Sequence, residues 1–253
     1  MLFRKLSLDW RYSLSELAIV VCGVLIALGA DNWASSRAEL VLEAQYLESF
    51  VTDLAADTVQ IRDAIRLAER RATSARLVLA VIDGAPGPSP NELAMSVEES
   101  MWLTFPAYSR TTISDLMSTG NLRLIRDSEF KRTIAEYYQA IERLDQWTVN
   151  WRRIQMDLEA LLPSLLNLKE RDAITAALND TPVAFWGAPL DVSSIEAAAI
   201  RSRLRTEPGV KPRLENMARV QGTVFAHLSL IDARARHALL AAQAQLDARK
   251  GAF

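Results

Sequence analysis

Residues 17–30, LAIVVCGVLIALGA, contain no charged side chain and no proline, although the rest of the sequence is rich in charge. As a helix these residues rise only about 21 Å, which is short of the roughly 30 Å hydrocarbon core of a bilayer. Extended to residues 12–33, the helix reaches about 33 Å and places Tyr12 and Trp33 near the two headgroup levels, where aromatic rings are favoured. The pattern predicts a transmembrane helix over residues 12–33.

The distribution of basic residues predicts the orientation of this helix. Lys and Arg residues near the ends of a membrane helix are held on the cytoplasmic side. Three basic residues occur in residues 1–11, but only Arg37 occurs among the twenty residues that follow the apolar stretch. We therefore expect a single-pass protein of the bacterial inner membrane, with residues 1–11 in the cytoplasm and residues 34–253 in the periplasm.

The apolar stretch also permits other interpretations. A basic start, an apolar run and small residues at Ala27 and Gly29 are typical of a cleavable secretory signal. Against cleavage, helical periodicity continues without a break from this stretch into the following chain. The lone Cys22 suggests a lipoprotein site, but Val20 and Val21 stand where small residues are needed, so we do not expect lipidation.

The predicted anchor carries a few polar and small residues, with Asn32 beside Trp33 in the outer interface. Glu16 either reaches the inner interface, where it meets Arg11 or lipid headgroups, or contacts a polar group on another membrane helix. Gly23 and Ala27 form a small-xxx-small pair that would let two helices approach closely. The expected partners are thus the lipid bilayer and either a second copy of the chain or another membrane protein.

The composition is that of an ordinary globular protein, with 253 residues, 50% apolar content, 24% charged residues and a formal net charge of −2. This balance gives no reason to expect nucleic acid as a partner, because phosphates select for clustered basic surface. A single cysteine excludes an intrachain disulfide. The exported part must therefore be stabilised by packing alone.

The spacing of apolar residues predicts helices throughout. Residues 35–82 contain no proline or glycine, and their apolar and small residues recur at steps of three and four, so one long helix should continue the anchor directly. Residues 84–91, GAPGPSPN, end it. No sustained alternation typical of strands occurs. We predict an all-α fold in which the N-terminal transmembrane helix continues into an antiparallel helical bundle with long helices. The remaining predicted elements are helices at 90–103, 111–119, 127 or 128 to 165 with a kink at Pro163, 193 or 194 to 205, and 212–249, and an irregular loop at 179–189.

The sequence contains no recognised catalytic or cofactor motif. His227 and His237 are the only histidines, and no HExxH motif or Cys/His cluster accompanies them, so we expect no zinc site. His227 lies beside the seam residue Leu228, and we interpret it as a partly buried, hydrogen-bonded side chain. No GxSxG elbow, Walker loop or GxGxxG fingerprint is present. We therefore predict no catalytic residue, no cofactor and no metal.

Other groups of reactive or aromatic side chains receive a structural interpretation. The carboxylate pairs at 53 and 57 and at 98 and 99 could act as acid and base or bind a hard metal, but such pairs on helices more often form solvated faces. Aromatic side chains at helical spacing more often belong to the core than to a ligand platform. The aromatic set that we assign to the core is Tyr137, Tyr138, Trp147 and Trp151.

Residues 102–127 form the segment with the strongest functional potential. They combine aromatic, hydroxyl and amide side chains with three arginines in a broken helical region, and irregular backbone on a rigid scaffold often carries function. One interpretation is a structural corner, in which Gly120 and Asn121 cap a helix and apolar residues plug the end of the bundle. The other is a site for an anionic group on a ligand, lipid or partner. The candidate residues for that site are Arg110, Thr111, Thr112, Asn121, Arg123 and Arg126.

A wider set of residues forms a recognisable pattern: Glu16, Gly23, 25–28, Asn32, Trp33, Tyr46, Leu47, Leu54, Leu116, Ser118, 120–122, Ile125, Tyr137 and Tyr138. Over about residues 14–140 the chain resembles an uncharacterised bacterial domain-of-unknown-function family of single-pass, N-terminally anchored helical proteins. The resemblance implies an uncleaved anchor and a helical remainder, and it brings no activity, cofactor or catalytic residue. The chain departs from the pattern at residues 29–31, Gly-Ala-Asp, where bulkier or amide residues are common.

Two functions are compatible with these features. The first is a non-enzymatic, membrane-anchored periplasmic helical module for interaction or scaffolding. The second is a periplasmic ligand-sensing bundle that signals through a membrane partner. It is less favoured because only about a dozen residues precede the predicted span and no second apolar run is seen. An enzyme with an unrecognised site comes third.

Overall fold

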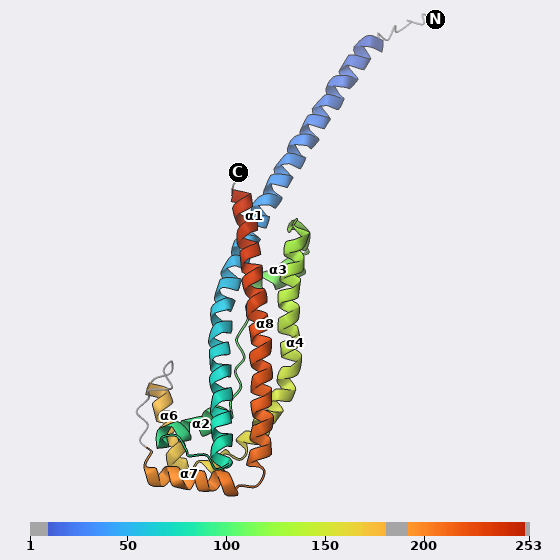
Figure 1. Ribbon diagram of the computed structural model, residues 1–253. Helices are drawn as coiled ribbons and strands as arrows, with labels where there is room; N and C mark the ends of the chain where they lie inside the picture. Colours follow the sequence, from blue (N-terminus) through green and yellow to red (C-terminus); the bar gives the residue numbers. More distant parts are fainter. Residues whose placement is uncertain (1–9, 181–191, 251–253) are drawn as a thin grey trace, which may run out of the picture.

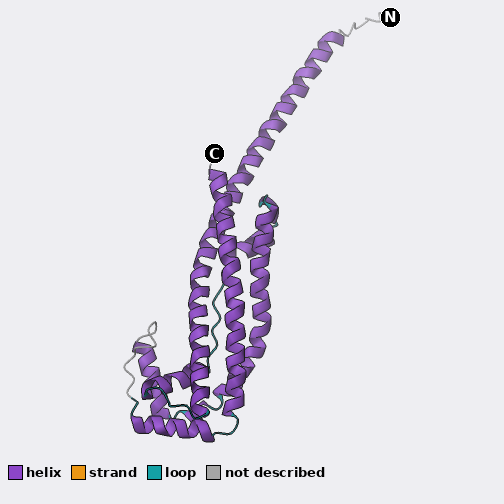
Figure 2. Cartoon of the chain, viewed as in Figure 1, coloured by secondary structure: helices purple, strands orange, loops and turns teal. Residues whose placement is uncertain are grey.

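The computed structural model describes residues 10–180 and 192–250, and these residues form helices and their connections without a strand (Figures 1 and 2). The predicted all-α class is therefore confirmed. The loop predicted at 179–189 lies outside the described residues from position 181 on, and its first two residues belong to a helix instead.

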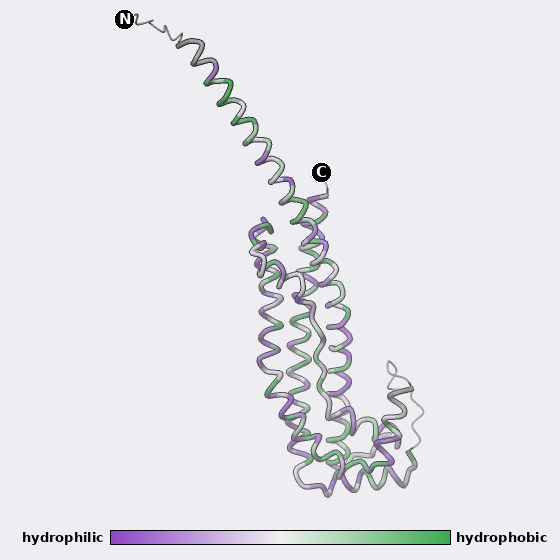
Figure 3. Tube along the Cα trace, turned by 180° about the vertical axis from the view of Figure 1, so that it is seen from behind, coloured by the Kyte–Doolittle hydropathy of each residue, from purple (hydrophilic) through white to green (hydrophobic). Residues whose placement is uncertain are grey.

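Helix α1, Trp10–Ile82, runs for 73 residues without interruption, which corresponds to about 110 Å. Its N-terminal part projects away from the other helices and is strongly hydrophobic, whereas its second half is packed (Figure 3). Within the described residues, α1 is the one helix that is long and apolar enough to cross a membrane. The prediction that the helix at 35–82 continues the apolar segment directly is confirmed.

Two further long helices, α4, Ser128–Glu159, and α8, Val210–Lys250, pack with α1. Helix α8 contacts both α1 and α4 and runs antiparallel to them (Figure 1). Helices α1 and α4 run in the same direction, which the expectation of a simple antiparallel bundle did not include. The reason is that the chain between α1 and α4 returns, largely as an extended segment, to the end of the bundle from which α1 projects.

This extended segment, residues 101–110, is here called the strap. It follows α2, Pro90–Ser100, which ends before the predicted position 103, and it lies alongside the long helices in the position of a fourth bundle helix (Figure 2). Pro106 disfavours helical backbone at the preceding residue, which keeps the strap extended. Its apolar side chains pack against the core of the bundle: Leu103, Phe105 and Tyr108.

The far end of the bundle is closed by α2 and three helices that follow α4. They are α5, Leu162–Leu165, α6, Leu168–Asp180, and α7, Ser194–Thr206. Helix α6 was not predicted. Pro163 lies in the first turn of α5 rather than at a kink, because the long helix α4 ends at 159. The predicted start of α7 at 193 or 194 is confirmed, since Ser193 is its N-cap and forms a capping box with Glu196.

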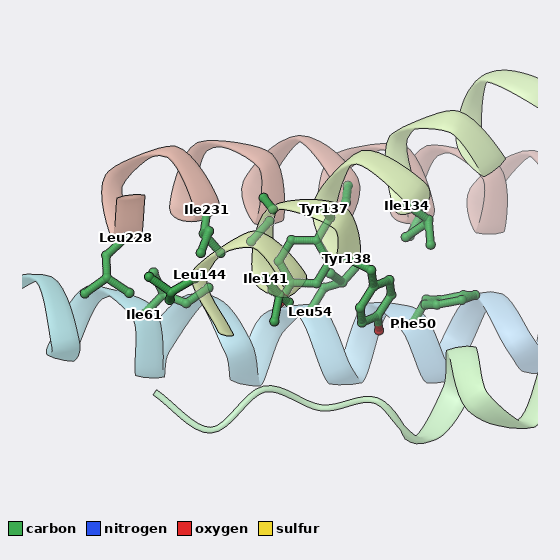
Figure 4. Close-up of a cluster of buried hydrophobic side chains, with 14 of the residues drawn as sticks. Phe50, Leu54, Ile61, Ile134, Tyr137, Tyr138, Ile141, Leu144, Leu228 and Ile231 are labelled. Carbon is green, nitrogen blue, oxygen red and sulfur yellow. The ribbon is translucent and has the colours of Figure 1, made fainter. Parts of the chain in front are cut away.

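The core consists of two hydrophobic clusters, one between the long helices and one at the far end. Figure 4 shows the first, where side chains from α1, α4 and α8 meet. The predicted seams of these helices supply its members. Examples that are almost fully buried are Leu54 and Ile61 from α1, Ile141 and Leu144 from α4, and Leu228 and Ile231 from α8.

Candidate functional site

Residues 111–127, here called the corner, lie at the end of the bundle from which α1 projects (Figure 1). The corner contains α3, Thr111–Ser118, and a 3₁₀ helix, η1, Asn121–Leu124. Gly120 joins them with φ of 71°, a left-handed conformation that glycine adopts without strain. The predicted end of a helix at Gly120 is thus confirmed, and the same residue leads into η1.

Two of the predicted site residues hold the strap and α3 against the long helices. Arg110, the last residue of the strap, forms an ion pair with Asp145 of α4. The Thr112 hydroxyl donates a hydrogen bond of 2.7 Å to the carboxylate of Asp53 on α1. Thr111 precedes it with an exposed side chain. Arg110 therefore joins the strap to α4, and Thr112 joins α3 to α1.

A third predicted residue, Asn121, joins a chain of hydrogen bonds. Its side-chain amide donates to the hydroxyl of Tyr46 on α1 at 3.0 Å. The Tyr46 hydroxyl in turn donates to the carboxylate of Asp115 on α3 at 2.6 Å. This chain connects both short helices of the corner to the same position on α1.

The remaining candidates meet acidic residues near the projecting part of α1. The guanidinium groups of Arg123 and Arg126 lie 2.9 Å and 3.8 Å from the carboxylate of Glu39. The backbone N–H of Arg126 donates to the carboxylate of Glu43, which is buried. Glu43 also pairs at 3.0 Å with Arg249 near the end of α8. The corner therefore ties α1 and α8 together where α1 leaves the bundle.

The α1 partners of these candidates form a polar stripe that the sequence interpretation missed. Glu39, Tyr46 and Asp53 follow one another at intervals of seven residues, and they extend over about 21 Å of helix. Thr112, Asn121, Arg123 and Arg126 contact this stripe, whereas Arg110 pairs with Asp145 on α4. The seven-residue interval was visible in the sequence and is the signal that could have located the stripe.

Two carboxylate pairs are not the solvated faces that we expected. Asp57 is fully buried and accepts hydrogen bonds from the Tyr137 hydroxyl at 2.6 Å and from the Ser109 backbone N–H at 2.9 Å. Glu99 is also buried and pairs with Arg70 at 3.2 Å. The interpretation failed because periodicity alone does not reveal the strap and α2, which cover these faces.

Burial raises the pKa of the Asp57 carboxyl above its ordinary value of 3.8, and hydrogen bonds from Tyr137 and Ser109 offset only part of that rise. A raised folded-state pKa means that the stabilising contribution of Asp57 is complete below pH 3.8 and is lost as the pH rises through the folded value. The folded protein therefore favours the protonated, neutral form of the Asp57 carboxyl.

The Asp57→Asn substitution is expected to lower the free energy of unfolding by about 1–3 kcal/mol at acid pH, because it replaces a buried hydrogen-bonding group. This loss should shrink as the pH rises toward neutrality, since only the unmodified protein must then ionise a buried carboxyl. Urea unfolding of both proteins across this pH range measures the effect. Asp63→Asn, at an exposed position of α1, is the control and should cost little at any pH. A pH-independent cost of Asp57→Asn would contradict the prediction.

The corner and α4 also enclose a groove of about 350 Å³, here called the corner groove. Helix α3 and η1 form one wall, α4 forms the other, and Phe50 of α1 also lines it. Its lining is predominantly apolar. The side chains that define its walls include Ile113, Leu116, Met117, Leu122, Phe130 and Ile134.

The predicted anchor residues all lie within α1. Glu16, Gly23, Ala27, Asn32 and Trp33 are exposed, and the side chain of the residue at position 12 lies outside the described part. A methyl group added at Gly23 would meet no other atom within 4 Å. This stretch of α1 is therefore open to lipid or to another helix.

The two histidines, His227 and His237, both lie on α8. Among the described residues, no three His, Cys, Asp or Glu side chains are placed so that they could hold a metal ion. One nitrogen of His227 lies 2.9 Å from the Thr223 carbonyl oxygen, and its ring meets the Trp151 ring edge-on at 5.8 Å. This contact agrees with the interpretation of His227 as a satisfied, partly buried side chain.

Fold and site together define a helical protein in which the exposed apolar part of α1 continues into a bundle, and in which ion pairs and hydrogen bonds hold the corner against α1. Comparison with protein-family models, curated proteins and solved structures found no match. The resemblance to an uncharacterised bacterial family therefore stays a prediction. Function has to be inferred from the geometry of the chain itself.

Proposed function

We propose that the protein is a membrane-anchored helical interaction module without enzymatic activity. In this proposal α1 spans the bacterial inner membrane once, its N-terminus is cytoplasmic and residues 34–253 lie in the periplasm. The observation that carries the proposal is the continuity of α1, which is a single helix of 73 residues from the apolar segment to the far end of the bundle.

The exposure of the apolar side chains supports the membrane span. Ile19 and Ile26 are 72% and 73% exposed, and the neighbouring apolar residues are similarly open. A contiguous apolar patch of this kind is costly in water and favourable in a bilayer. From Leu47 onward, by contrast, one face of the same helix is buried in the bundle. One helix thus serves as anchor and as core element.

The contacts that hold the corner against the long helices support a role as a scaffold. Ion pairs and hydrogen bonds join the corner to α1 and α8 close to the point where α1 leaves the bundle. In this arrangement the bundle is presented at a defined distance from the membrane. Such a module can bind a periplasmic or membrane partner, including a second copy through the Gly23 and Ala27 face of the anchor.

A second candidate function is ligand sensing with signal transfer to a membrane partner. The corner groove favours this candidate, because it is an apolar cavity beside the helix that would enter the membrane. A ligand that stabilises the purified protein against heat in a saturable way would support sensing. Co-purification of a membrane protein without any ligand would support the scaffold.

A topology experiment tests the proposal. Reporters that are active only outside the cytoplasm are fused after residues 40 and 253, and the membrane fraction is analysed for an intact N-terminus. We expect both fusions to be active and membrane-bound, because the basic residues precede the span. Silent reporters would place the bundle in the cytoplasm. Active reporters on a shortened, released product would show that residues 17–30 act as a cleaved signal.

A further inference from the structure

The shape of the corner groove distinguishes between classes of occupant. It extends along α4 from Lys131 to Glu142, which corresponds to about 16 Å of helix. A volume of about 350 Å³ over that length gives a mean cross-section of about 22 Å². Because the groove is long and narrow and its walls are apolar, it suits one extended, unbranched chain.

Polar groups occur chiefly at the α4 side of the groove and differ along its length. Lys131 lines the end nearer the start of α4, and Glu142 lines the other end. Within the described residues Lys131 forms no ion pair, and Glu129 and Glu136 on the same helix both pair with Arg132. The carboxylate of Asp127, one turn before Lys131, accepts hydrogen bonds from the Phe130 backbone N–H and the Gln245 amide instead. An anionic headgroup would thus be attracted to the Lys131 end and repelled from the Glu142 end.

The position of the groove relative to the anchor favours a ligand from the bilayer. Phe50, which lines the groove, follows Trp33 by seventeen residues of unbroken helix, or about 26 Å. The start of α4 also lies at the end of the bundle from which α1 projects (Figure 1). A lipid-derived chain that leaves the outer leaflet would encounter this end first, provided that α1 spans the membrane as in the proposed function.

We propose that the corner groove binds a single-chain anionic amphiphile, such as a long-chain fatty acid, with its acyl chain along α4 and its carboxylate at Lys131. The apolar walls supply the contacts for the chain, and removal of the chain from water drives its binding. The ammonium group of Lys131 supplies a charge-assisted hydrogen bond to the carboxylate. Occupancy of the corner groove would then depend on the amount of free acyl chains at the membrane surface.

The test uses the full chain in lipid nanodiscs and a palmitate analogue that carries a photoactivated diazirine on its chain. After irradiation, labelled peptides are mapped by mass spectrometry. We expect labels both in the anchor, from probe dissolved in the bilayer, and in the two walls of the groove, residues 111–125 and 130–142. Unlabelled palmitate should suppress the groove labels only. Palmityl alcohol and a cationic amphiphile of equal chain length should compete poorly, because they lack the carboxylate.

Variants make the assignment specific. Ala135→Trp fills the groove and should abolish its labelling, while Val149→Trp, at an exposed position of α4 outside the groove, should leave it unchanged. Lys131→Gln should weaken competition by palmitate about tenfold, because it removes a charge-assisted hydrogen bond. Thermal unfolding and anchor labelling confirm that each variant is folded and inserted.

The two proposals fail in different ways. Absence of labels in residues 17–30 would overturn the membrane anchor of the proposed function. Labels confined to the anchor, or groove labels that persist in Ala135→Trp, would overturn the binding of an acyl chain in the groove. Equal competition by palmitate and palmityl alcohol would overturn the assignment of an anionic headgroup.

Discussion

Replacing Arg203 by alanine is expected to lower the free energy of unfolding by about 3 kcal/mol. Its guanidinium group lies 2.7 Å from the carboxylate of Glu170, whose side chain is only 2% exposed. Glu170 also accepts a hydrogen bond from the Asn167 backbone N–H at the start of α6. Removal of Arg203 would leave a buried carboxylate without its charge partner, and the exposed pair of Lys169 with Glu196 would still join α6 to α7.

An exposed ion pair provides the control for this prediction. Arg66 pairs with Asp63 one turn away on α1, and their side chains are 77% and 56% exposed. Arg66→Ala should therefore cost less than about 1 kcal/mol. Adding Glu170→Gln to the Arg203→Ala variant should restore part of the loss, because it removes the unpaired charge. Urea unfolding measures all three variants, and equal losses for Arg66→Ala and Arg203→Ala would contradict the argument from burial.

The long helices could be predicted because each carries a sustained apolar seam and clear ends. The seam at Leu54 and Ile61 continues through most of the packed half of α1, and Asp127 caps α4 through a hydrogen bond to the Phe130 backbone N–H. Short elements offered weaker signals. Helix α6 was missed because three of its six apolar residues are alanines and the others form no sustained seam, and it is held by contacts such as that between Glu170 and Arg203.

The candidate site could be predicted only in part, because sequence patterns identify faces but not what covers them. The segment 102–127 was correctly expected to be irregular, yet the acidic partners of its arginines lie far away in the sequence, on α1 and α4. Likewise, Asp57 occupies a helix face that looks solvated until the strap covers it. The corner groove combines Phe50 with residues 113–142, and each of its apolar side chains, taken alone, is indistinguishable from a core residue.

A proline at position 38 is expected to uncouple the anchor from the bundle. Ala38 is exposed and lies in α1 between the predicted span and the corner. Proline there would remove the backbone hydrogen bond to residue 34 and clash with its carbonyl, at a local cost of about 3 kcal/mol. Because no helix of the described part of the chain covers this position, the chain should relieve the strain by bending at this point, while the core of the bundle stays intact.

Distances between spin labels at Cys22 and at Val59→Cys measure this coupling, since both positions are exposed. The unbroken helix predicts one narrow distribution near 55 Å in the otherwise unmodified protein. Ala38→Pro should shift and broaden it, whereas Ala38→Leu, which is compatible with a helix, should not. A broad distribution without the proline would show that α1 already flexes between membrane and bundle. The bundle would then be a tethered domain rather than one held at a fixed position by its own anchor, and scaffolding would lose its main support.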